Sequence, residues 1–176
     1  YKKIFKRIEK VIRKGDYTLG SEVDQFEKNI SKLTSAKYTI GVGNGTDALY
    51  LALKCLGIGR GDEVITTPYT FIATVGSIVT VGAKPVFVDI KDDYNIDENK
   101  IEMAITKKTK AIMPVHWAGR PCELSKISKI AKKYNLKIIQ DSCHAIMSKY
   151  HRKDIISFGD ICTFSMHPLK NLNVWG

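Results

Sequence analysis

Short, nearly continuous apolar segments alternate with segments of helical periodicity along most of this chain. The segments 63–66, 111–115 and 137–141 lack the apolar–polar alternation of a sheet with one solvated face, and strands that are covered on both faces have this pattern. The alternation predicts an α/β fold, a three-layer α/β/α sandwich with a mostly parallel sheet. In such sheets ligands bind outside the carboxyl ends of the strands, so the residues that follow each strand are the candidates for function.

Periodicity and turn residues set the expected bounds. Ser21 is expected to cap a helix, with Asp24 at the capping-box position, Asp97 to cap another, and Pro121 to open the last. The predicted helices are 1–14, 21–33, 46–56, 70–81, 97–105 and 121–135, and the predicted strands are 38–42, 63–66, 85–89, 111–115, 137–141 and 160–165.

Composition limits the class of protein. The 176 residues are 44% hydrophobic and 26% charged, the balance of a globular protein that can bury a core. No apolar run approaches the ~20 residues of a membrane helix, and no apolar segment of a secretory signal follows the basic start. We therefore expect a cytoplasmic protein without membrane insertion. Because the chain lacks a starting Met and stops abruptly, we also expect a fragment that is cut at both ends.

The cysteines match no zinc pattern, so we expect no metal site. Their spacings contain no C-x-x-C pair, and without an export signal reduced thiols are the default. We expect all of them to be small, mostly buried residues: Cys55, Cys122, Cys143 and Cys162.

The net charge of +10 permits nucleic-acid binding, but its distribution argues against that reading. The lysines are dense in 2–14, 107–110 and 126–137, and in each group they alternate with apolar residues at helical spacing. This pattern is typical of a solvated helix face backed by a core face. A positive field would still attract an anionic substrate.

A glycine-rich loop precedes the predicted helix at 46. Gly45, Thr46 and Asp47 lie where a helix start offers free N–H groups and the positive end of the helix dipole, which suit a phosphate. The loop fits neither a Walker motif nor the dinucleotide fingerprint. The alternative is a plain strand-to-helix turn that Thr46 or Asp47 caps.

Other strand ends carry further candidates. Phe71 offers a flat face to a ring, or is a core aromatic; Asp141 meets a cation or a hydrogen-bond donor, or caps a helix. Ser165 and Lys170 lie in the last strand-end loop rather than on a charged helix face. Together the loops supply what pyridoxal 5′-phosphate requires, namely a lysine, an anionic partner for its ring nitrogen and a phosphate site.

With this set of residues, the chain resembles the DegT/DnrJ/EryC1/StrS sugar aminotransferases, fold type I enzymes that use pyridoxal phosphate. The resemblance runs through almost the whole chain. Among the segments that carry it are Gly45-Thr46-Asp47-Ala48-Leu49, Pro68-x-Thr70-Phe71, Pro114-Val115-His116, Asp141-x-x-His144-Ala145 and Ser165-x-His167-x-x-Lys170.

The resemblance implies a role for each matching residue. Lys170 would bind the cofactor covalently, Asp141 would pair with the ring nitrogen, and Phe71 would stack on the ring. The backbone of Gly45, Thr46 and Asp47 would hold the phosphate together with the Ser165 hydroxyl, and His144 would lie beside the ring near its 3′-oxygen.

The chain departs from the family pattern at a few positions. Gln140 replaces the usual Glu, Ser142 and Cys143 follow Asp141, and Met166 replaces the usual Phe. None of these changes removes a catalytic group. Some relatives carry His in place of the lysine and are dehydratases, so Lys170 favours transamination.

The resemblance also implies the reaction and the assembly. The donor would be glutamate, the acceptor a nucleotide-linked keto-sugar, and the product would feed the synthesis of surface polysaccharide or glycosides. Residues 1–176 would form the N-terminal part of the large domain of a homodimeric enzyme, without its small C-terminal domain and without a nucleic-acid partner. Two alternatives stay open: a dehydratase or cofactor-binding sensor of the same fold, and a binding module for another phosphate ligand.

Overall fold

The computed structural model describes residues 2–174, which fall into two compact units that meet between Gly41 and Val42. The smaller unit contains helices α1 (Lys2–Lys14) and α2 (Ser21–Thr34). The larger unit contains all the strands and every predicted site residue. Within residues 2–174, no helix is long and apolar enough to cross a membrane.

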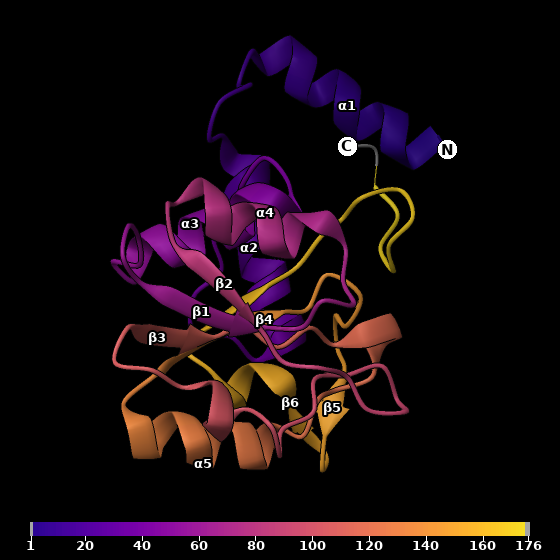
Figure 1. Ribbon diagram of the computed structural model, residues 1–176. Coiled ribbons are helices and arrows are strands. Elements are labelled where there is room, and N and C mark those ends of the chain that lie inside the picture. Colours follow the sequence, from indigo (N-terminus) through magenta and orange to yellow (C-terminus); the bar gives the residue numbers. More distant parts are fainter. Residues whose placement is uncertain (1, 175–176) are drawn as a thin grey trace. The chain divides into compact units, whose positions relative to one another are not determined.

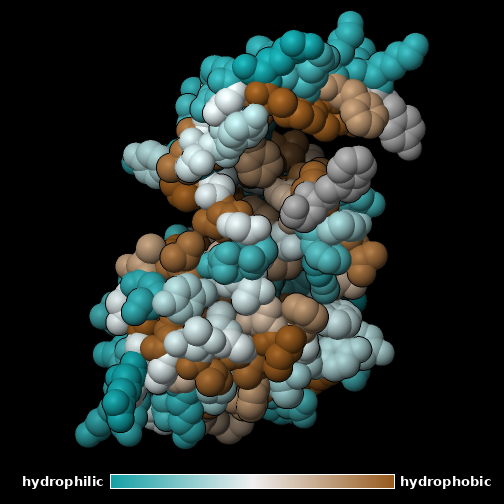
Figure 2. Space-filling model, turned by 90° about the horizontal axis from the view of Figure 1, so that it is seen from above, coloured by the Kyte–Doolittle hydropathy of each residue, from teal (hydrophilic) through white to brown (hydrophobic). Residues whose placement is uncertain are grey.

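Helix α1 is strongly amphipathic and has no buried residue. Hydrophobic side chains form a band along it, flanked by hydrophilic ones (Figure 2). The large members of this band are Ile4, Phe5, Ile8 and Ile12. Their spacing confirms the predicted helix within the described residues.

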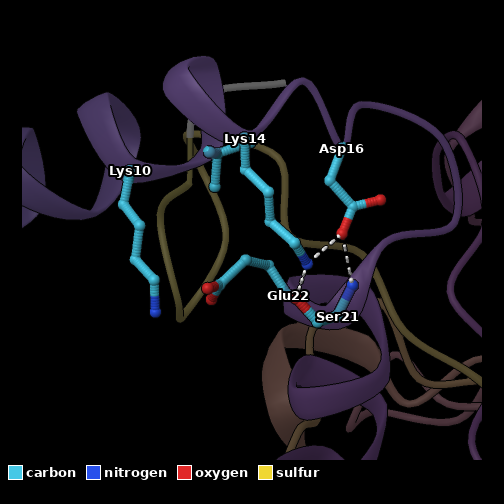
Figure 3. Close-up of a pocket in the computed structure, with 6 residues that line it drawn as sticks. Lys10, Lys14, Asp16, Ser21 and Glu22 are labelled. Atoms are coloured by element: carbon cyan, nitrogen blue, oxygen red, sulfur yellow. Dashed lines mark hydrogen bonds and ion pairs between the residues drawn. The ribbon is translucent and has the colours of Figure 1, made fainter.

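The turn between α1 and α2 is held by side chains rather than by the predicted capping box. Gly20, which has no side chain, is the N-cap of α2, so the expectation for Ser21 and Asp24 was wrong. Asp16 instead accepts from Lys14 Nζ at 2.7 Å and from the Ser21 N–H at 3.3 Å (Figure 3). The pocket around these residues contains none of the predicted site residues.

Parallel strands form one sheet in the larger unit. Its strands are β1 (Glu63–Thr66), β2 (Lys84–Phe87), β3 (Thr109–Ile112), β4 (Lys137–Asp141) and β7 (Ile161–Thr163). Their spatial order is β2-β1-β3-β4-β7, and every pairing is parallel. Because β2 and β3 lie on opposite sides of β1, the strand order reverses beside β1, and α/β sheets bind ligands at such a point.

Helices cover both faces of this sheet (Figure 1). On one face, Val64 and Ile139 pack with Leu53 of α3 (Gly45–Cys55) and Ile78 of α4 (Ile72–Thr80). On the other face, the core contains Ile65, Ile112 and Ile138 together with Ile127, Ile130 and Ala131 of α5 (Leu124–Tyr134). Neighbouring strand residues thus enter different cores, which explains the continuous apolar runs and confirms the α/β/α sandwich.

Short elements complete the unit. The 3₁₀ turns are η1 (Glu102–Ala104), η2 (Trp117–Gly119) and η3 (Ile155–Phe158), and β5 (Lys149–Tyr150) pairs antiparallel with β6 (Lys153–Asp154). Helix α5 begins at Leu124 after its N-cap Glu123, so Pro121 lies before the helix and does not open it.

The predicted strand at 38–42 was wrong. This segment has no strand partner among residues 2–174, and the Gly41 N–H donates to Glu27 Oε1 at 2.7 Å. A strand needs a neighbour to complete its hydrogen-bond ladder, and β-branched composition does not supply one.

The predicted helix at 97–105 was also wrong, since only the 3₁₀ turn η1 forms there. Asp97 Oδ1 accepts from the N–H of Asn99, which makes a local turn rather than a helix cap. Ile96 and Ile101 are both fully buried.

Candidate active site

The start of α3 offers free donors. Asn44 is the N-cap, and its side chain accepts from the N–H of Asp47 at 2.9 Å, so neither Thr46 nor Asp47 is the cap. The N–H groups of Gly45 and Thr46 have no acceptor among residues 2–174. These two donors, rather than all three that were predicted, are available to an anion.

Gly45 faces the loop that follows β7. A Cβ atom at Gly45 would lie 2.9 Å from the Cβ of Ser165 and 3.2 Å from the Sγ of Cys143. Real Cβ atoms essentially never approach another atom within 3.0 Å, so only glycine fits here. The structure therefore brings the predicted phosphate loop and Ser165 together.

Asp141 ends β4 and is 6% exposed. Its Oδ2 accepts from the Thr74 hydroxyl at 2.7 Å, and its Oδ1 accepts from the Cys143 N–H at 3.3 Å. A carboxylate has about four lone-pair sites, so capacity for another donor remains. The side chain is not a helix cap.

Lys170 lies in the turn after β7, where its N–H donates to the carbonyl of His167 at 2.8 Å. Its ammonium acts electrostatically on two residues of the β4 loop. Burial, and then the charge of Lys170, lower the pKa of His144. Burial and Asp141 raise the pKa of the Cys143 thiol, and the charge of Lys170 opposes that rise. Lys170 is therefore within electrostatic range of His144 and Cys143, two residues of the loop that follows Asp141.

Phe71 is the N-cap residue of α4, and its side chain is 65% exposed. This exposure excludes the core-aromatic alternative. The backbone of Phe71 connects Thr70 to the first turn of α4, which carries Thr74. A ring-stacking role for Phe71 stays a prediction.

A row of aromatic rings follows the carboxyl edge of the sheet. The ring centroids of Tyr94 and Tyr69 lie 5.3 Å apart, those of Tyr69 and Trp117 4.6 Å, and those of Trp117 and His144 5.7 Å. The contacts run in the spatial order of the preceding strands β2, β1, β3 and β4. Tyr69 and Tyr94 are both exposed, so the row presents ring surface next to His144.

A buried pair lies between β3 and β4, beside Asp141. His116 Nδ1 accepts from the Cys122 N–H at 3.1 Å, so the proton of the neutral ring is on Nε2, which donates to Gln140 Oε1 at 2.8 Å. Gln140 Nε2 in turn donates to the carbonyl of Ile155 at 3.0 Å. Burial lowers the pKa of His116, and the neutral Gln140 suits a neutral imidazole.

The cysteines differ from the prediction in one case, because Cys55 is exposed. Cys122 is buried, while Cys143 and Cys162 are partly buried, and burial raises the pKa of Cys162 to about 12. Among residues 2–174, no group of three or more His, Cys, Asp or Glu side chains is arranged to hold a metal ion.

Sequence reasoning missed some residues that complete the site. Thr74 holds Asp141, Asn44 caps α3, and Cys143 lies against Gly45. Asn44 was detectable, because Asn is a favoured N-cap residue and stands directly before the helix. Nothing local in the sequence signals the other two contacts, since each joins segments that are far apart in the chain.

Comparison with known proteins places this geometry in a family. The model of the DegT/DnrJ/EryC1/StrS aminotransferase family matches residues 1–176. The chain is 45% identical to the "Pleiotropic regulatory protein" of Geobacillus stearothermophilus, over 98% of this chain and 47% of that protein. It is 47% identical to the dTDP-3-amino-3,6-dideoxy-alpha-D-galactopyranose transaminase of Aneurinibacillus thermoaerophilus, over 93% of this chain and 46% of that protein.

A solved structure agrees. NtdA from Bacillus subtilis, with the bound cofactor PMP, superimposes with a TM-score of 0.93 at 38% identity, over 98% of this chain and 39% of that one. The chain spans about half the length of the curated relatives that it matches.

Proposed function

The chain belongs to the DegT/DnrJ/EryC1/StrS aminotransferase family, and on that premise we propose that it binds pyridoxal 5′-phosphate and takes part in amino transfer to a sugar. One observation supports this most directly. At the carboxyl edge of one sheet the structure brings together a glycine whose Cβ would clash with Ser165 and a buried carboxylate with spare acceptor capacity, and Lys170 acts electrostatically on the loop that follows this carboxylate. The complex of the relative NtdA with PMP supports the choice of cofactor.

The phosphate end fits the start of α3. The free N–H groups of Gly45 and Thr46 and the hydroxyl of Ser165 would bind the phosphate oxygens, helped by the positive end of the helix dipole. The absence of a side chain at Gly45 leaves the space that the phosphate requires. Asp47 would contribute through its position in the first turn, because its N–H is already bound by Asn44.

The reactive end fits Asp141 and Lys170. When bound, pyridoxal phosphate supplies an electron sink that stabilises negative charge on a substrate carbon. The Asp141 carboxylate would accept a hydrogen bond from the ring nitrogen and keep that nitrogen protonated. Lys170 Nζ would bind the cofactor covalently and, once released, would take a proton from the substrate carbon as a general base and return it to another carbon atom as a general acid. Phe71 would stack on the ring, with His144 near the 3′-oxygen.

The names of the relatives support the proposed substrates. A relative named as a dTDP-sugar transaminase supports a nucleotide-linked keto-sugar as the acceptor, and we propose glutamate as the donor. The relative SpsC of Bacillus subtilis, a spore coat polysaccharide biosynthesis protein, supports a product used in surface polysaccharide. We further propose that the enzyme works as a homodimer in the cytoplasm, and that the present residues belong to its cofactor-binding domain.

A second candidate is a cofactor-binding sensor. It is favoured by the name of the regulatory relative from Geobacillus stearothermophilus. A sensor needs the cofactor site without turnover, so the two candidates differ in multiple-turnover assays with an amino donor and a keto-sugar nucleotide.

Borohydride reduction tests the proposal. In the full-length protein loaded with pyridoxal phosphate, reduction followed by peptide mass spectrometry should place the pyridoxyl group on Lys170. Lys170→Ala should prevent the labelling and abolish turnover. Lys149→Ala, which removes a lysine that faces Asp154 on the β5–β6 hairpin, is the matched control and should leave the labelling unchanged. Labelling at another lysine would refute the assignment.

A further inference from the structure

Asp141 is connected to the start of α4 by a chain of hydroxyl groups. Thr74 Oγ1 lies 2.7 Å from Asp141 Oδ2, and Thr70 Oγ1 lies 2.7 Å from Thr74 Oγ1. Thr74 is fully buried and Thr70 is partly buried. The contact joins residues that are 67 positions apart in the chain.

The hydrogens in this chain have one direction when Asp141 is ionised. A carboxylate only accepts, so the single hydroxyl proton of Thr74 goes to Asp141. The proton between the two threonines must then come from Thr70. Hydrogen bonds in such a chain polarise one another, so Thr70 strengthens the bond from Thr74 to Asp141.

The two oxygens of Asp141 are held unequally. Oδ2 has the short bond from Thr74, whereas Oδ1 has the longer contact of 3.3 Å from the Cys143 N–H, and the Cys143 thiol also interacts with this carboxylate. The backbone of Asp141 is itself fixed, because its N–H donates to Pro114 and its carbonyl accepts from the His116 N–H. The remaining freedom is rotation of the carboxylate group, and the bond from Thr74 restricts it.

Resting on the proposed function, we infer that Thr74 is a positioning residue for Asp141, with Thr70 supporting it. Thr74 fixes the plane of the carboxylate, so that the oxygen that Thr74 does not bind can accept from the protonated ring nitrogen. Thr70 and Thr74 lie on either side of Phe71, so one turn of α4 carries both the aromatic side chain and the group that orients the anion. Partners of this kind, one step removed from the reacting atoms, hold a site within the tolerance that catalysis requires.

The test compares Thr74→Val with Thr74→Ser in the full-length protein loaded with pyridoxal phosphate. Val keeps the shape and removes the hydroxyl, whereas Ser keeps the hydroxyl. In Thr74→Val we expect the midpoint of the pH titration of the cofactor absorbance to move by about 0.5–1 pH unit, the effect of one lost hydrogen bond. The spectral change on adding L-glutamate should slow by about 10–100-fold, as with other orienting partners. Thr74→Ser should restore both values.

Ser77→Ala is the matched control. Ser77 is a buried hydroxyl in the same helix that donates to the carbonyl of Thr74 and does not contact Asp141. It should lower stability without moving the titration. Thr70→Val should shift the titration in the same direction as Thr74→Val but less, and it carries the test if Thr74→Val does not fold.

The outcomes separate this inference from the proposed function. If the wild-type protein binds no cofactor at Lys170, the proposed function fails, and the inference fails with it. If the wild type binds and the Thr74→Val titration overlays it, only the inference is overturned. A Thr74→Ser variant as impaired as Thr74→Val also overturns it, because the hydroxyl would then not be the cause.

Discussion

Gly45 and Ser165 approach so closely that a Cβ atom on the glycine would lie 2.9 Å from the Cβ of the serine. Gly45 is the first residue of α3, and Ser165 follows β7. Leu53 of α3 packs in one core with Ile139 of β4, the strand beside β7. The backbone of a helix start is therefore pressed against a strand-end loop. This arrangement leaves the donors of the helix start accessible where a side chain would cover them.

Gly45→Ala should weaken cofactor binding more than it affects folding. The added methyl group overpacks against Ser165, at a cost of about 1–3 kcal/mol, and part of that cost falls on the bound state because the methyl group occupies the phosphate space. We expect a cofactor affinity about tenfold lower or more, measured by absorbance titration of the full-length protein.

Gly76→Ala is the control for this change. Gly76 lies in α4, where a Cβ would meet nothing within 4 Å, and alanine favours a helix over glycine by about 1 kcal/mol. This variant should bind cofactor normally and be at least as stable as wild type. Equal affinities in the two variants would contradict the account of Gly45.

Asp141→Asn should reduce turnover about 10²–10³-fold, because the ring nitrogen would lose its compensating anion. Asp160→Asn is the control, since Asp160 precedes β7 and its carboxylate binds Lys137 and the N–H of Ile138, at the amino end of β4. It therefore lies at the opposite edge of the sheet from the site. Steady-state rates of both variants check this. Near-normal activity of Asp141→Asn would show that another group stabilises the ring nitrogen.

The stability of the protein should fall between pH 6.5 and pH 5. Burial lowers the pKa of His116, and burial and Lys170 lower the pKa of His144. Below pH 6.5, the ordinary pKa of histidine, the unfolded chain therefore binds more protons at these residues than the folded chain does. The stabilisation is fully present above pH 6.5 and is lost as the pH falls toward the lowered folded pKa values. The slope is at most about 1.4 kcal/mol per pH unit for each group.

Urea unfolding of the protein from pH 7.5 to pH 5 measures this slope. The carboxylates with a lowered pKa, such as Glu63 and Glu98, titrate below this window, and Lys91 and Lys133, with a raised pKa, titrate above it. His116→Asn, compared with wild type, should flatten the profile even if it lowers stability at every pH. A profile in wild type that is flat across the window would refute this assignment.

The architecture was predictable because its two signals, the apolar runs of the strands and the periodicity of the helices, are local in the sequence. An apolar run such as 137–141 must be covered on both faces, and the helical periodicity of 124–134 indicates an amphipathic helix that can cover one of them. The segment 38–42 has equally good strand composition, yet it pairs with no strand among the described residues. Composition states what a segment tolerates, whereas pairing depends on the rest of the fold.

The same distinction applies to the site. The positions of Asp141, Ser165 and Lys170 at one edge were predictable because a parallel sheet brings the residues after its strands together, and the position of Gly45 was predictable from a glycine-rich loop before a helix start. Thr74 was not, because its role depends on the angle at which α4 leaves the β1 loop and on a carboxylate 67 residues away. The aromatic row is a similar case: each ring follows a different strand, and their contacts exist only in the folded sheet.

Asn95 should matter more for stability than its place in a loop suggests. It is fully buried, its Oδ1 accepts from the Trp117 N–H at 3.0 Å, and its Nδ2 lies within 3.3 Å of the carbonyls of Arg120 and Pro121. These bonds fasten the loop that carries Tyr94 to the loop that carries Trp117, and so hold the aromatic row in place.

Asn95→Ala leaves the Trp117 N–H and two carbonyls without partners, so it should lower the free energy of unfolding by about 1–3 kcal/mol. Asn99→Ala is the matched control, because Asn99 is exposed and its side chain bonds only to surface groups. Its effect should stay within about 0.5 kcal/mol. Urea unfolding of the two variants at pH 7.5 gives the comparison. Similar small losses in both would mean that water replaces the buried amide and that the two loops keep their positions without it.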